Sequence, residues 1–132
     1  MKVCVWSSLC FLGAAFATNY KILYLLWVAS TLNHLGYKWI HTPDKILAHA
    51  ICARSLQTIP WALSGYVFLY WLCWFWALYI YYISGLSHKN DYWHASLHAG
   101  TSIAMVAHSK AHTSSSSELL LLGTDRPAKL SN

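Results

Sequence analysis

Apolar stretches separated by short polar connections run along most of the chain. The stretches at residues 20–37 and 66–83 are long enough to cross a membrane, because a spanning helix needs roughly 20 predominantly apolar residues. Shorter apolar runs precede and follow them at residues 3–16 and 93–107. The pattern predicts an all-α protein built from membrane-crossing helices.

The segment at residues 44–63 is the ambiguous part of this pattern, because charged and polar residues interrupt its apolar positions. If it crosses the membrane, His34 and His94 lie at the same membrane face; if it lies on the surface, they lie at opposite faces. The distribution of lysine and arginine between the loops favours a surface location for this segment, because positive charges collect on the cytoplasmic side. Against this, an arginine such as Arg54 inside a span costs roughly 2.5 to 3.5 kcal/mol, which apolar neighbours and a buried partner offset. Both topologies are open.

The composition places the chain in the membrane class. Hydrophobic residues make up 57% and charged residues 10%, whereas soluble domains are roughly 45–50% apolar and about 25% charged. We predict an integral, multi-pass helical bundle of about 4–5 transmembrane segments. The net charge of +5 is spread without a dense basic run, which argues against nucleic acid as a partner. The four cysteines form no C-x-x-C pair, so neither a disulfide framework nor a zinc–thiolate motif is predicted.

The pattern divides the chain into three parts. Residues 1–17 begin with a lysine, continue as an apolar run and end in Ala15-Phe16-Ala17, which is typical of a cleaved signal peptide. An uncleaved first transmembrane helix is the alternative. Residues 18–108 would form the transmembrane bundle, and the serine-rich residues 109–132 a flexible polar tail. We expect the protein in the endoplasmic reticulum and secretory pathway or in the plasma membrane.

Polar residues near the ends of the apolar stretches have the spacing of a metal site. His94 and His98 lie four residues apart and therefore share one helix face, as zinc-binding histidine pairs do. His34 would supply a third imidazole and leave a fourth position for water. Zinc held in this way activates water and polarises a carbonyl. Asp44 would orient a ligand or accept the proton of that water. Ser30, one helical turn before His34, would hydrogen-bond the oxyanion.

Each of these residues also has an ordinary structural explanation. A histidine pair often hydrogen-bonds within a bundle, and a serine in a membrane helix usually bonds back to its own helix. Asp44, beside Pro43, suits a helix cap. Only the combined order of serine, histidine, aspartate and a terminal histidine pair favours one shared site.

That order resembles the CREST superfamily of membrane hydrolases, which includes alkaline ceramidases, adiponectin-type receptors, GPI-remodelling Per-type lipases and myomaker. The run from Asp91 to His98 is similar to the signature of the last helix in that family, with Leu97 where the family usually has tryptophan. The following Ala99-Gly100-Thr101 is similar to the Per-type branch.

The resemblance implies that His34, His94 and His98 are zinc ligands, that Asp44 lies near the activated water, and that Ser30 is the oxyanion partner. It further implies hydrolysis of an amide or ester bond in a membrane lipid. The family has seven spans, whereas this chain has at most five. Two helices of the family pattern, with the pocket wall they form, would therefore be absent.

Two other functions are open. The strongly aromatic stretch at residues 66–83 suits a small, non-catalytic structural or assembly protein that packs against partner membrane subunits. Alternatively, His94 and His108 on one helix, together with His34 and His49, resemble the paired axial ligands of haem b.

Overall fold

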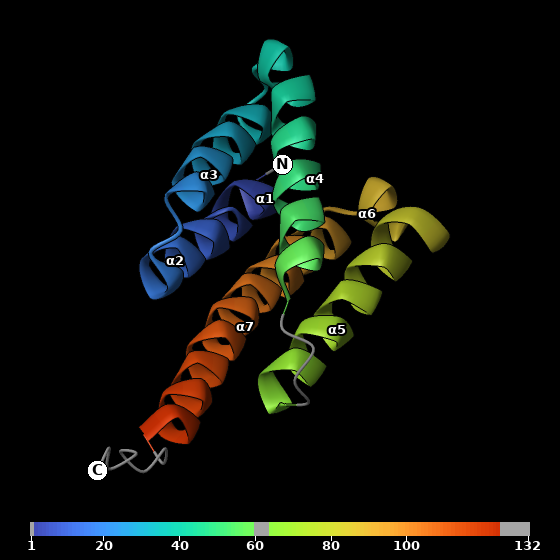
Figure 1. Ribbon diagram of the computed structural model, residues 1–132. Helices are drawn as coiled ribbons and strands as arrows, with labels where there is room; N and C mark the ends of the chain where they lie inside the picture. The colour runs from blue at the N-terminus through green and yellow to red at the C-terminus, as the bar shows by residue number, and fades with distance from the viewer. Residues whose placement is uncertain (1, 60–63, 125–132) are drawn as a thin grey trace, which may run out of the picture.

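The computed structural model describes residues 2–59 and 64–124 (Figure 1). All regular elements in these ranges are helical and none is a strand, which confirms the predicted all-α class. In chain order they are α1 (Lys2–Ser7), α2 (Leu9–Thr18), α3 (Lys21–His34), the 3₁₀ helix η1 (Lys38–Ile40), α4 (His41–Thr58), α5 (Gly65–Leu78), the π-helix η2 (Tyr79–Ile83), α6 (Leu86–Lys89) and α7 (Asp91–Thr124).

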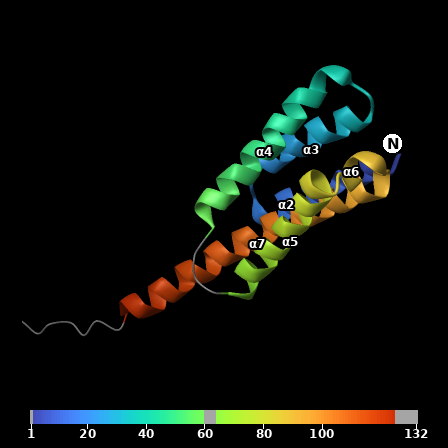
Figure 2. The ribbon, with the colours of Figure 1, turned by 90° about the vertical axis from the view of Figure 1, so that its right-hand side faces the viewer.

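The long helix α7 is the element on which most others pack. α1, α2, α5 and α6 all contact it, and α3 contacts α1, α2 and α4. Figure 2 shows α3 and α4 as one hairpin, with α5 beside α7 and the last turns of α7 extending past the other helices. The bundle therefore has α7 as its axis.

Small side chains on α7 let the neighbouring helices approach closely, as in many membrane helix pairs. Ala104, Ala107 and Ala111 are all buried. A Cβ atom on Gly100 would lie 3.3 Å from Cδ1 of Trp76, so a larger residue there would press on the α5 side chain. Opposite these positions, the buried Tyr70 of α5 accepts a hydrogen bond from Nε1 of Trp74 (2.8 Å).

A glycine turn reverses the chain between α3 and α4. Gly36 has φ +98°, a left-handed value that favours glycine. Its amide donates to the carbonyl of Asn33 (3.0 Å), and the amide of Tyr37 donates to that of Leu32 (3.2 Å). This is the Schellman pattern of a helix C-terminus. The reversal brings the first turn of α4, with Asp44, back beside the last turn of α3.

The ambiguous segment 44–63 corresponds to α4 and to residues 60–63, which lie outside the described residues. α4 runs away from the turn after α3, and α5 runs back toward it (Figures 1 and 2). The end of α3 and the start of α7 consequently lie at the same end of the bundle. Among the described residues, one helix, Gly65–Ile83, is long and apolar enough to cross a membrane, and it combines α5 with η2.

The N-terminal residues form part of the packed bundle. α1 and α2 contact both α3 and α7, and Phe11, Ala14 and Ala15 are buried. Cleavage after Ala17 would remove both helices. Cleavage as a signal peptide and retention as a helix both stay predictions.

The C-terminal part differs from the expected flexible tail, because α7 continues through residues 109–124. The hydroxyls in this stretch donate to carbonyls four residues earlier, which is how serine and threonine are accommodated inside a helix. The residues concerned are Thr113, Ser114, Ser116 and Ser117. The remainder of the predicted tail, residues 125–132, lies outside the described residues.

Candidate metal centre

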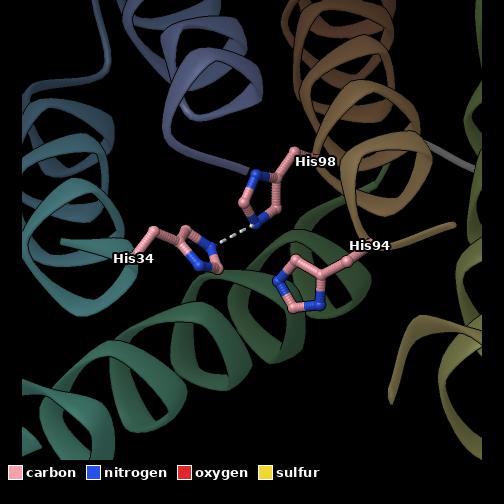
Figure 3. Close-up of side chains that lie close together, drawn as sticks. All are labelled: His34, His94 and His98. Atoms are coloured by element: carbon pink, nitrogen blue, oxygen red, sulfur yellow. Dashed lines mark hydrogen bonds between the residues drawn. The ribbon is translucent and has the colours of Figure 1, made fainter. Parts of the chain in front are cut away.

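Three histidines meet where α3 ends and α7 begins (Figure 3). His34 is the last residue of α3, and His94 and His98 lie one turn apart near the start of α7. The ring centroid of His34 lies 4.9 Å from that of His94 and 5.1 Å from that of His98. The centroids of His94 and His98 are 4.8 Å apart. The three imidazoles singled out in the sequence thus form one cluster, which we call the histidine cluster.

The spacing of the ring nitrogens fits a metal ion. One nitrogen from each histidine lies within 4.8 Å of the others, and the Nε2 atoms of His34 and His98 are 3.5 Å apart. A tetrahedral ion that binds nitrogen at 2.0–2.1 Å spaces its ligand nitrogens about 3.3–3.4 Å apart. The closest pair of nitrogens is thus already near the spacing of tetrahedral ligands, and all three lie within 4.8 Å of one another. Imidazole is a ligand for zinc, copper, iron and nickel alike.

A serine from α1 orients His98, and sequence reasoning missed it. The Ser7 hydroxyl donates to the carbonyl of Cys4 (3.0 Å) and lies 2.9 Å from Nδ1 of His98. When the single proton of the Ser7 hydroxyl is directed to Cys4, the Ser7 oxygen accepts the Nδ1 proton of His98. The Nε2 atom of His98, which faces His34, is then the unprotonated nitrogen that a metal requires. Histidine ligands commonly have their other ring nitrogen fixed in this way.

Ser30 and Asp44 line a cavity of about 210 Å³ beside the histidine cluster. His94 and His98 line it as well, and Ser30 is buried. The rest of the lining is mostly apolar and includes Phe11, Leu26, Trp74, Leu78 and Leu97. The structure thus brings both candidate catalytic residues to the same cavity as two of the candidate ligands.

Asp44 is held by the residue that precedes a candidate ligand. The Asn33 side-chain amide donates to Oδ2 of Asp44 (2.7 Å), and the Asn33 oxygen accepts a hydrogen bond from Nδ1 of His41 (3.2 Å). The Asp44 side chain is half-buried. Asn33 therefore fixes one oxygen of a half-buried carboxylate close to the cluster.

The other histidines of the haem hypothesis have different partners. His49 contacts the Tyr82 hydroxyl, and His108 contacts the hydroxyls of Thr58 (2.9 Å) and Tyr20 (3.3 Å). The ring of His34 lies against the rings of His94 and His98, so these imidazoles do not face one another across the space that a haem would occupy. This arrangement favours a small ion over haem b.

Cys4, Cys10, Cys52 and Cys73 are free thiols in the structure. In comparisons with known proteins, no family model, no curated protein and no solved structure matches this chain.

Proposed function

We propose that the chain is a CREST-like membrane protein in which His34, His94 and His98 hold a zinc ion that serves hydrolysis of a lipid amide or ester. One observation carries the proposal: three imidazoles converge beside a cavity that also contains a carboxylate and a serine hydroxyl. Three histidines with a fourth position left to water are a ligand set of catalytic zinc.

Zinc in such a site lowers the pKa of water to about 7 and polarises a carbonyl. Asp44 would accept the proton of the attacking water, because its carboxylate lines the same cavity as His94 and His98. Ser30 would donate its hydroxyl to the oxyanion that develops on the carbonyl. Asn33 would keep the Asp44 carboxylate directed at the cavity through its 2.7 Å hydrogen bond. Each of these proposed roles thus falls to a side chain that the structure describes.

Large apolar side chains on the outside of the bundle support a membrane location. Trp6, Phe16, Phe68 and Ile83 each expose more than two thirds of their surface. In water, covering such surface is favourable by roughly 25 cal/mol per Å², so a bilayer or partner helices would cover it. The helix Gly65–Ile83, which is long and apolar enough to cross a membrane, would supply one crossing. The expected total of about 4–5 crossings and entry into the secretory pathway or plasma membrane are part of the proposal.

The exposed aromatic surface of α5 also favours a second candidate function, an assembly protein without catalysis. Phe68 and Phe75 are 71% and 65% exposed, so this helix has an apolar face available to a partner membrane subunit. Such a protein would keep the histidine cluster as a structural metal site. The two functions differ in whether the protein hydrolyses lipid.

Metal analysis and hydrolysis together test the proposal. The protein, purified from membranes in detergent, should carry about one zinc per chain, and His98→Ala should carry almost none. Vesicles containing a labelled N-acyl sphingoid base or a labelled phosphatidylcholine should release fatty acid with the wild-type protein. Asp44→Asn should keep the zinc and lose the release, because the proton acceptor is gone.

His112→Ala is the matched control, because His112 lies on α7 outside the cluster. It should keep both zinc and activity. Absence of stoichiometric zinc, or unchanged metal content in His98→Ala, contradicts the metal centre. Zinc without fatty acid release from either lipid contradicts the hydrolase and favours the assembly protein.

A further inference from the structure

A second cavity lies at the end of the bundle opposite the histidine cluster, between the start of α3, the second half of α4 and the middle of α7. We propose that it binds the phosphate-bearing head group of an anionic phospholipid. Its volume is about 720 Å³. His34 is at the other end of α3, about 20 Å along the helix axis. None of the candidate metal ligands lines this cavity, so the proposal is independent of the hydrolase.

The charged lining of this cavity is basic. Lys21 and Arg54 line it together with His108 and His112, and the lining residues that the structure describes include no aspartate or glutamate. Two cations with no carboxylate among the described lining residues attract an anion. Arginine and lysine bind phosphate through short, charge-assisted hydrogen bonds, which arginine often makes in pairs. A phosphate group, which carries negative charge and several acceptor oxygens, therefore suits this lining.

Hydrogen bonds hold one wall of the cavity in place. The Thr58 hydroxyl donates to the backbone carbonyl of Arg54 (2.9 Å) and lies 2.9 Å from Nε2 of His108, whose proton the Thr58 oxygen accepts in this arrangement. The Tyr20 hydroxyl is then the donor to Nδ1 of His108 (3.3 Å). These bonds link α3, α4 and α7 around the cavity. Because the wall is formed in advance, little ordering is needed when a ligand binds.

The apolar part of the lining distinguishes a phospholipid from free phosphate. Ile22, Leu47, Ile51 and Met105 line the cavity, and a phosphate ion alone would leave them uncovered. Ile22 is 42% exposed, and Leu25, one turn further along α3, is 60% exposed. Acyl chains could continue along these side chains while the head group lies between Lys21 and Arg54. Basic cavities between helices bind anionic head groups in this way.

Binding of a short-chain phosphatidic acid below its micelle concentration tests the proposal by calorimetry on the full chain in neutral detergent. We expect saturable binding that weakens about tenfold in Arg54→Gln and further in the double variant with Lys21→Gln. Arg54→Lys should keep most of the affinity, because it keeps the charge. Phosphatidylcholine of the same chain length should bind at least tenfold more weakly than phosphatidic acid.

The double variant Lys38→Gln with Lys89→Gln is the matched control, since both lysines are exposed and neither lines the cavity. It should bind like the wild-type protein, and far-ultraviolet circular dichroism should show that all variants are equally helical. Equal loss of affinity in this control contradicts the proposal, because it would show attraction by net charge alone. Competition by inorganic phosphate at the same concentration as the lipid contradicts the lipid assignment and identifies free phosphate as the ligand.

Discussion

The helix α7 contains two histidine pairs with the same spacing and nearly the same geometry. The ring centroids of His94 and His98 are 4.8 Å apart, and those of His108 and His112 are 4.7 Å apart. The inner member of each pair is buried, with His98 at 6% and His108 at 5% exposure. Judged as isolated motifs, the two pairs are equivalent.

The pairs differ in what the neighbouring helices supply. The first pair meets a third imidazole, His34 of α3, whereas the second meets the hydroxyls of Tyr20 and Thr58. One environment offers three nitrogen donors to an ion, and the other uses the ring nitrogens for hydrogen bonds between helices. A histidine pair with i, i+4 spacing therefore acquires its chemistry from the helix that packs against it.

The largest effect is expected from removing His34, the residue that distinguishes the first histidine pair from the second. His34→Ala leaves the first pair without its third imidazole, so zinc affinity should fall more than about 100-fold, beyond the loss typical of outer partners of a ligand. Equilibrium competition with a zinc-binding dye measures the affinity. His108→Ala, which disrupts the second pair, should leave zinc affinity unchanged. Similar losses of zinc affinity in the two variants would show that the two histidine pairs do not differ in metal binding.

A smaller effect is expected from Ser7. Its hydroxyl fixes the proton of His98 on Nδ1, whereas the proton of His108 lies on Nε2, beside Thr58. Ser7→Ala should weaken zinc binding about 10–100-fold, the range observed for outer partners of histidine ligands. Ser7→Thr keeps the hydroxyl and should restore most of the affinity. Ser96→Ala is the control, because that hydroxyl donates to the Trp93 carbonyl of its own helix (2.8 Å). If Ser7→Ala binds zinc as tightly as Ser96→Ala does, Ser7 has no positioning role.

The smallest expected effect concerns stability at the second pair. Thr58→Val keeps the shape of the side chain but removes the acceptor of the His108 Nε2 proton. The free energy of unfolding should fall by about 1 kcal/mol, the usual contribution of one hydrogen bond. Denaturant unfolding in detergent, followed by circular dichroism, measures the change, and zinc content should stay constant. A change in zinc content would show that the second pair takes part in metal binding.

The sequence predicted the helical class and the individual members of the histidine cluster, because both depend on local patterns. Apolar length identified the helix around α5, and the spacing of His94 and His98 places them on one face. Their meeting with His34 depends on the direction of α4, which the interrupted segment 44–63 left open. That direction follows in part from Gly36, whose positive φ no hydropathy pattern reveals.

Ser7 and Asn33 were missed for a different reason. Ser7 lies in an apolar run whose composition is that of a signal peptide, so nothing local distinguishes it from Ser8. Its role arises from packing of α1 against α7. Asn33 is adjacent to His34 and faces Asp44 only because the chain reverses between them. Contacts between helices, rather than motifs within them, carry this information.

One continuous helix, α7, joins the two ends of the molecule. His94 and His108 are separated by four turns of one unbroken helix, about 21 Å. A ligand that tilted or rotated α7 at one end would displace the ring nitrogens at the other. Coupling of this kind is reciprocal: any factor by which an occupant of the basic cavity changes zinc affinity is the factor by which zinc changes affinity for that occupant. Titrating one ligand at fixed concentrations of the other measures this coupling free energy directly.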